Sequence, residues 1–261
     1  MEIPLFPLHM VLCPGIVLPL HIFEDRYRAM TRRCLDTGEP FGVVLIRDGR
    51  EIGTARMATL AGVGAFAEIR QAGRYPDGRF DLLAAATGRF AIESVDAQTE
   101  PYLLAEVTPL DDEVGDEPRA ERLAAAAIGR FVRYLDLMRA RDGETTEVLD
   151  IRVEIESQHD DVMDRPPGRP EMEGLEGAAE GSEPESTPDL KIPDDPTVLS
   201  YLLSGIVQVE LPRRQALLEA ETTVERLDGL VSLLERELVL LSRRLRYFSP
   251  DPALLGGARR S

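Results

Sequence analysis

The chain has 261 residues, 43% of them apolar, and a formal net charge of −17. This length suits one large or two small domains with a sizeable core, and the absence of tryptophan leaves that core to aliphatic side chains. Twelve acidic and two basic residues fall between Glu154 and Asp189, so this segment alone carries −10 of the charge. The remainder, at −7, offers no evident basic surface, and we do not expect the chain to bind nucleic acid.

Two cysteines, Cys13 and Cys34, are too few for a disulfide framework in a chain of this length. A reducing compartment is therefore the simpler interpretation. The first residues lack a basic stretch, and no uncharged run approaches the roughly 18 residues of a membrane span. We expect a cytoplasmic protein with neither a signal peptide nor a membrane partner.

The first 22 residues are apolar and interrupted by prolines. Each proline removes a backbone donor, so long central strands are not expected here. Short extended pieces around a turn at Pro14 and Gly15 fit better. A helix is then predicted over residues 23–36, with a shared apolar face made of Phe23, Tyr27, Met30 and Cys34.

Short apolar runs broken by turn residues follow and predict β-strands. The predicted strands cover residues 41–46, 61–71, 80–86, 90–95 and 102–110. The stretch from Tyr75 to Arg79 has strong turn chemistry, and Gly88 is expected to end one strand before the next begins. Several strands at this spacing with one early helix suggest a small, closed or half-closed β-barrel of five or six strands.

Helical periodicity replaces the strand pattern after Pro118. The predicted helices cover residues 119–141, 197–207, 212–220 and 223–246. Asp195 is a possible cap for the second of them, with Pro196 in its first turn. The leucine stripe of the last helix is expected to pack against the first two, while its end near Leu240 is a possible exposed contact between copies of the chain.

These patterns predict an α+β chain in five parts. They are a β-barrel subdomain at 1–115, a helix and an ambiguous segment at 116–156, an acidic disordered insertion at 157–192, a helical subdomain at 193–248 and a flexible tail at 249–261. The insertion is rich in Glu, Pro, Gly and Ser and offers almost nothing to bury, so it cannot offset its ordering entropy. Residues 145–155 fit either a strand or a helix.

No catalytic constellation is recognisable. A phosphate-binding loop needs Gly-Lys followed by Ser or Thr, yet the only lysine, Lys191, follows Leu190. A Ser–Lys dyad needs a desolvated lysine, which is implausible at the edge of the acidic insertion. The histidines His9, His21 and His159 lack a Gly-x-Ser-x-Gly partner motif. We therefore predict a chain without catalytic residues.

A metal set could be imagined from His9, Cys13, His21 and Cys34. Their intervening lengths of three, seven and twelve residues match no common zinc finger. Buried structural cysteines and ordinary histidines are the better interpretation, and no metal or cofactor is expected.

Three blocks of sequence, in this order, resemble the N-terminal substrate-binding domain family of Lon proteases. The first block is the start at residues 3–8 with Val11, Pro14, Pro19, Leu20 and Phe23; the second is 62–65, 77–79 and 87–90; the third is 194–196, 214–219 and 224–227. The resemblance covers residues 3–155 and 193–245. It implies a PUA-like β-barrel followed by a helical bundle, here in a free-standing form without ATPase or peptidase domains. The acidic insertion departs from the family pattern.

The resemblance also implies a function, namely recognition of unfolded or exposed apolar polypeptide. The chain would then act as a non-catalytic adaptor or holdase in protein quality control, alongside a protease or chaperone. The expected peptide-binding residues lie in the proline-rich start: Pro4, Leu5, Phe6, Pro7, Leu8, Pro19, Leu20 and Phe23. Extended segments there could leave strand edges open to a peptide, or could instead close the barrel. The alternative function is a PUA-like RNA-binding module.

Overall fold

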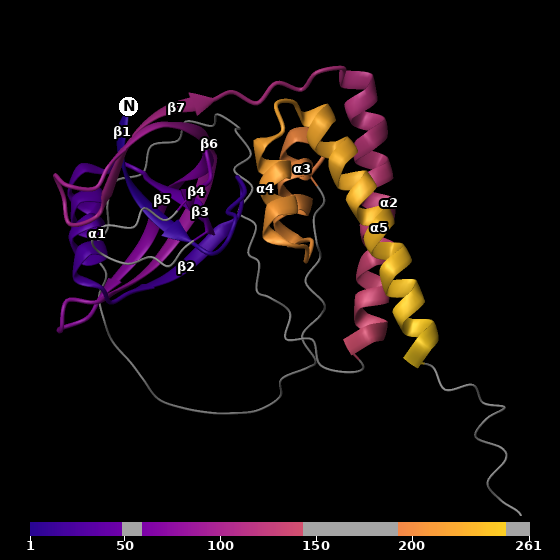
Figure 1. Cartoon of the computed structure of the whole chain (residues 1–261), viewed down its shortest axis with the longest axis horizontal. Helices are drawn as coiled ribbons and strands as arrows, with labels where there is room; N and C mark the ends of the chain where they lie inside the picture. The colour runs from indigo at the N-terminus through magenta and orange to yellow at the C-terminus, as the bar shows by residue number, and fades with distance from the viewer. Residues whose placement is uncertain (49–58, 143–192, 249–261) are drawn as a thin grey trace, which may run out of the picture. The chain divides into compact units, whose positions relative to one another are not determined.

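The computed structural model describes residues 1–48, 59–142 and 193–248 (Figure 1). The ambiguous segment 145–155, the acidic insertion 157–192 and the tail 249–261 lie outside the described residues, so the predictions made for them are not addressed. The described parts consist of a seven-stranded mixed sheet and five helices, as the α+β prediction requires.

The sheet is built from strands that cover most of the first 110 residues. They are β1 (Glu2–Leu8), β2 (Val17–Ile22), β3 (Phe41–Asp48), β4 (Thr59–Leu60), β5 (Val63–Arg74), β6 (Phe80–Asp96) and β7 (Leu103–Leu110). The strand order is β1-β7-β6-β5-β3-β4, and β1 also pairs with β3. The hydrogen-bonded path from β1 through β7, β6, β5 and β3 therefore returns to β1 and closes a ring.

The first 22 residues form short extended pieces as expected, but β1, at seven residues, pairs with a strand on each side despite its prolines. This strand pairs antiparallel with β7 through Glu2–Leu5 and parallel with β3 through Leu5–Leu8. Because the two pairings are staggered, Pro4 faces only one partner strand and Pro7 only the other. Each proline can turn its missing donor toward the unpaired side, and the strand loses no ladder bond.

The predicted break at Gly88 was wrong. β6 runs uninterrupted for 17 residues through this position. The irregularity is instead a register shift between β5 and β6. Phe66 pairs with Gly88, and the next residue, Ala67, pairs with Ala86. Such a bulge bends a strand without ending it. The bend lets β6 pair with β2 through its first half and with β7 through its second half.

Helix α1 (Asp25–Thr37) confirms the early helix and most of its predicted face. Tyr27, Met30 and Cys34 are buried and pack against the interior of the sheet, whereas Phe23 is 62% exposed. The helix begins at Asp25, so Phe23 precedes it and does not share its face. A left-handed Gly38, with φ of 72°, ends the helix.

The remaining helices match the sequence prediction closely. They are α2 (Glu117–Asp142), α3 (Pro196–Ile206), α4 (Leu211–Glu219) and α5 (Thr223–Phe248). Asp195 caps α3 by accepting hydrogen bonds from the backbone N–H groups of Thr197 and Val198. Figure 1 shows α2 and α5 side by side and running in the same direction, and a parallel bridge between Glu113 and Thr222 precedes them.

The leucine stripe of α5 packs as predicted. Leu227, Leu230 and Leu234 are fully buried in one apolar cluster with residues of α2 and α3. A second cluster fills the sheet beneath α1. A third cluster joins the two halves, because it contains Tyr201 of α3 and Leu218 of α4 together with sheet residues such as Phe90.

Candidate functional site

Five of the eight predicted peptide-binding residues lie in β1 and contribute to the core. Pro4, Leu5, Phe6 and Pro7 are buried, and Leu8 is half-buried against the interior of the sheet. One edge of β1 pairs with β7 through Glu2–Leu5, and the other pairs with β3 through Leu5–Leu8. These residues therefore close the sheet and present no surface to an incoming chain. Of the two arrangements predicted from the sequence, β1 adopts the closing one and does not leave an edge open to a peptide.

The other three predicted residues lie on or beside β2, at the surface. Pro19 is exposed, Leu20 is half-buried, and Phe23 follows the strand with 62% of its surface exposed. Among the described strands, β2 pairs with β6 alone. The outer edge of β2 and the Phe23 ring thus form the exposed part of the predicted site.

The backbone of β2 limits how a peptide can bind this edge. The N–H of Ala86 donates to the carbonyl of Ile16 over 3.0 Å, so this backbone group of Ile16 points toward β6. Alternation then directs the backbone groups of Val17, Pro19 and His21 away from β6. Pro19 has no N–H, so an added strand would find a gap at the middle of the edge. A peptide at this edge would therefore depend mainly on side-chain contacts.

A polar cluster holds the aromatic side chains beside this edge. Nδ1 of His21 lies 2.6 Å from Oδ1 of Asp81, and the hydroxyl of Tyr75 donates to the other carboxylate oxygen. Nη1 of Arg79 lies 3.4 Å from Nε2 of His21. The hydrogen bond from Tyr75, followed by that from His21, lowers the pKa of Asp81. The ring of Phe23 stacks on His21 at a centroid distance of 6.3 Å.

This cluster is arranged for positioning rather than for proton abstraction. A guanidinium can only donate, so the neutral tautomer of His21 that satisfies both contacts accepts at Nε2 and donates from Nδ1 to Asp81. A serine-type site needs that Nε2 to face a nucleophilic hydroxyl, and here it faces Arg79. The arrangement can fix the rings of His21, Tyr75 and Phe23 as a preformed aromatic surface.

The four side chains once considered as a metal set are not brought together. Cys13 and Cys34 are buried in two different apolar clusters, whereas His9 and His21 are exposed. Burial raises the pKa of both thiols to about 11, so they stay protonated at neutral pH. Within the described residues, no group of three or more His, Cys, Asp or Glu side chains could hold a metal ion.

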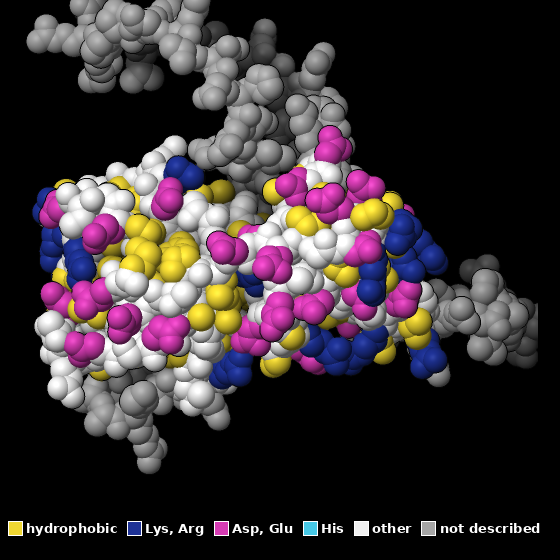
Figure 2. All heavy atoms as spheres, turned by 90° about the horizontal axis from the view of Figure 1, so that it is seen from above, with side chains coloured by type: hydrophobic (Ala, Val, Ile, Leu, Met, Phe, Trp, Pro, Cys, Tyr) yellow, Lys and Arg dark blue, Asp and Glu magenta, His cyan; other side chains and the backbone are white. Residues whose placement is uncertain are grey.

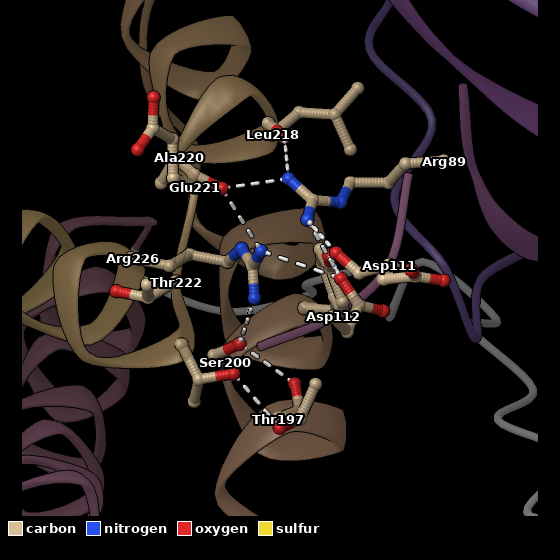
Figure 3. A network of polar contacts seen from close by, with 12 residues as sticks. Arg89, Asp111, Asp112, Thr197, Ser200, Leu218, Ala220, Glu221, Thr222 and Arg226 are labelled. Carbon is tan, nitrogen blue, oxygen red and sulfur yellow. Dashed lines mark hydrogen bonds and ion pairs between the residues drawn. The ribbon is translucent and has the colours of Figure 1, made fainter. Parts of the chain in front are cut away.

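A buried polar network between the sheet and the helices was not anticipated from the sequence (Figure 3). Arg89 of β6 and Arg226 of α5 are 2% and 0% exposed, and both guanidinium groups lie over the ring of Tyr201 from α3. The central carbon of the Arg226 guanidinium is 3.8 Å from the ring centroid. Asp112, which follows β7, lies 2.9 Å from Arg89 and 3.7 Å from Arg226.

Backbone carbonyls satisfy most of the remaining donors of this network. Arg89 donates to the carbonyls of Leu218 and Ala220 at the end of α4, over 2.9 and 2.7 Å. Arg226 donates to the carbonyl of Ala220 over 3.3 Å and to the hydroxyl of Ser200 over 3.1 Å. Burial lowers the pKa of Arg226. The donors point into the protein and not into a cavity, so this network is a structural joint.

A sequence signal for the joint did exist. Arg89 lies in the block 87–90 and Arg226 in the block 224–227, both of which carry the family resemblance. Their role was missed because each arginine looks like an ordinary surface residue in its own segment. Only the packing of β6 against α4 and α5 brings the two together.

One face of the molecule shows how charge is distributed (Figure 2). Acidic side chains surround a hydrophobic patch over the sheet half, and basic and acidic side chains are mixed over the helical half. This face lacks the continuous basic surface that a nucleic-acid backbone requires. Across the described part of the chain, no helix combines the length and apolarity needed to cross a membrane.

The described fold is similar to solved structures of Lon N-terminal domains. The Lon N-terminal domain protein from Xanthomonas campestris matches with a TM-score of 0.52 and 22% identity, over 89% of this chain and 98% of that chain. The N-terminal domain of the Mycobacterium avium complex Lon protease matches with a TM-score of 0.53 and 18% identity, over 90% and 98%. The fold is therefore that of a Lon N-terminal domain.

The chain belongs to the family of the ATP-dependent protease La (LON) substrate-binding domain, whose model matches residues 2–236. A curated relative, the Lon protease of Azorhizobium caulinodans, is 24% identical over 247 residues, which cover 93% of this chain and 24% of that protein. The chain thus spans about a quarter of the length of the curated relatives it matches.

Proposed function

We propose that this chain binds exposed apolar segments of unfolded polypeptides through the surface formed by Leu20, Phe23 and Tyr75. The observation that carries the proposal is Phe23, a large apolar ring that is 62% exposed beside the edge strand β2. An exposed aromatic ring held by neighbouring side chains buries apolar area on binding at little cost in ordering. The name of the family, a substrate-binding domain, supports the same activity.

The position of Pro19 supports recognition of many sequences rather than one. The gap left by Pro19 reduces the number of backbone bonds that a bound strand can make. Affinity then depends mainly on contacts with aromatic and aliphatic side chains, which tolerate different apolar partners. A binding surface of this kind suits an adaptor or holdase that delivers unfolded chains to a protease or chaperone without cleaving them.

The buried, protonated thiols of Cys13 and Cys34 suit a reducing, cytoplasmic setting for this function.

The proposal is tested by anisotropy with a fluorescent, permanently unfolded client and by suppression of client aggregation. Phe23→Asp should weaken client binding about ten-fold, because it removes the apolar contact and adds a charge. Leu35→Asp is the matched control, since Leu35 is also exposed, at 43%, but lies on α1. Equal binding by Phe23→Asp and the wild type would refute the proposed surface. Failure of the wild type to bind any unfolded client would refute the function.

A further inference from the structure

The parallel pair α2 and α5 extends beyond the short helices that cover it. Helix α3 ends at Ile206 and α4 begins at Leu211, and a groove of about 490 Å³ opens beside the connection between them. Its apolar lining comes from α2, α5 and this connection, and consists of Tyr134, Met138, Val209, Leu240 and Leu241. A volume of this size accepts one or two large side chains of a partner.

Three basic and two acidic side chains lie at the rim of the groove. Arg213, Arg214 and Arg236 line it together with Glu210 and Glu237, a local balance of +1 in a chain of net charge −17. Arg213 is already paired with Glu210 at 3.0 Å. The sign of the rim is therefore opposite to that of the whole chain.

One stripe of α5 combines an apolar side chain of the groove with basic side chains. Arg236, Leu240 and Arg243 stand at positions i, i+4 and i+7, so all three share one face of the helix, and all three are exposed. Leu240 is 41% exposed and lines the groove. Neither Arg236 nor Arg243 forms an ion pair with another described residue, in contrast to Arg130, which is paired with Glu235 at 2.6 Å.

We propose that this groove docks a helical segment of a partner protein that carries one large apolar side chain flanked by carboxylates. The apolar side chain would enter beside Leu240, and the carboxylates would meet Arg236 and Arg243. These two arginines are separated by seven residues, or roughly 10 Å along α5. A partner helix that packs nearly parallel to α5 presents the same spacing when its acidic residues are also seven apart. The site is distinct from the β2 surface and does not depend on the function proposed for it.

The probe is a 15-residue helical peptide with a central leucine, two glutamates seven residues apart and alanine or glutamine elsewhere. A second peptide has lysines in place of the glutamates. Anisotropy with the full chain should show the glutamate peptide binding about ten-fold more tightly than the lysine peptide at low salt, and the difference should shrink as salt is raised. The double variant Arg236→Glu with Arg243→Glu should reverse this preference. Reversal by charge exchange cannot arise from a folding defect.

Two further variants locate the binding. Leu240→Asp should weaken the glutamate peptide about ten-fold, because the apolar contact is lost. Phe23→Asp should leave this affinity unchanged, so failure of the groove and failure of the β2 surface are distinguishable. The proposal is overturned if the two peptides bind equally or if the charge-reversed chain keeps its preference. It is also overturned if the chain is a dimer that Leu240→Asp converts to a monomer, since a second copy then occupies the groove.

Discussion

The sheet half and the helical half of this chain reach a packed core by different means. In the sheet, strand spacing is fixed by hydrogen bonds, and the interior is filled around small residues such as Ala65, Ala84 and Gly64. In the helices, leucines along α5 fill the space, and their spacing can adjust to the side chains present. The sheet therefore has little tolerance for added volume, whereas the helices are most sensitive to lost volume.

The joint of Arg89, Arg226, Asp112 and Tyr201 connects these two halves. It places two guanidinium groups where water has little access, beside the partly exposed carboxylate of Asp112. Charges in such a place are stabilising only while their partners remain, because an unpaired buried charge costs several kcal/mol. We expect the joint, the helices and the sheet to respond to substitution in that order.

The largest effect is expected from Arg226→Ala. This change removes donors from buried carbonyls and the side chain that stacks on Tyr201, so unfolding should require about 3–5 kcal/mol less free energy. Urea unfolding followed by circular dichroism gives the loss, and hydrogen exchange shows whether the sheet then opens separately from the helices. Arg236→Ala, at an exposed site, should change stability by no more than about 0.5 kcal/mol. Similar losses for both arginines would contradict the structural role of the joint.

Within the helical half, Leu234→Ala should be the most informative change. Leu234 is fully buried in the cluster formed with α2 and α3. Its truncation leaves a cavity and should cost about 3 kcal/mol of unfolding free energy. Leu240→Ala, at a position that is 41% exposed, is the control and should cost less than about 1 kcal/mol. The same urea titration measures both variants.

Within the sheet half, the corresponding change is Gly64→Ala. A Cβ at this position would lie 2.6 Å from the backbone oxygen of Val43 and 2.5 Å from the ring of Phe90. A backbone oxygen cannot move aside cheaply, so we expect a loss of about 2 kcal/mol. Gly62→Ala meets nothing within 4 Å and should be nearly neutral. A sheet that accepts Ala at both positions would show that its spacing is more adjustable than the helical core.

A smaller effect is expected at the start of α3. Asp195→Ala removes the side chain that accepts hydrogen bonds from Thr197 and Val198 and should cost about 1 kcal/mol. Asp195→Ser restores a capping oxygen and should recover most of the loss. Thermal melts of the three proteins would provide the comparison. Equal melting temperatures for the Ala and Ser variants would show that the cap contributes nothing.

At neutral pH the smallest effect comes from the two buried thiols, because their titration changes stability only as the pH rises further. The pKa of Cys13 and of Cys34 is about 11 in the folded chain, against 9.0 for a free thiol, because burial disfavours the thiolate. Between these values the unfolded chain loses protons that the folded chain keeps, so stability should fall as the pH rises from about 9 to about 11. At pH 8, a thiol reagent should label the unfolded chain rapidly and the folded chain only after it opens. Rapid labelling of the folded chain would contradict their burial.

Much of the fold could be predicted because it depends on local pattern. The helical periodicity around Leu227, Leu230 and Leu234 gave α5 and the face that it buries. The turn from Tyr75 to Arg79 was visible in its residues and is closed by a hydrogen bond from the Tyr75 N–H to the Arg79 carbonyl. The PUA-like description of the sheet and the role of the acidic insertion stay predictions.

The proposed binding surface was only partly predictable, because the accessibility of its residues depends on strand pairing. The sequence marked the prolines and apolar residues of β1 and β2 as one group. Whether they are accessible depends on which strands lie beside them. β1 has a neighbour on both edges and is buried, while β2 has one described neighbour and leaves Pro19 and Phe23 at the surface.

The sequence by itself therefore determined the class of the chain, its family and the position of nearly every helix and strand, because propensity, caps and periodicity act over a few residues. Tertiary structure alone decided that β1 closes the ring, that Gly88 lies within a continuous strand, and that Arg89 and Arg226 meet over Tyr201. These features join residues up to 137 positions apart. No local pattern records such a contact, since its energy exists only when both partners are packed together and removed from water.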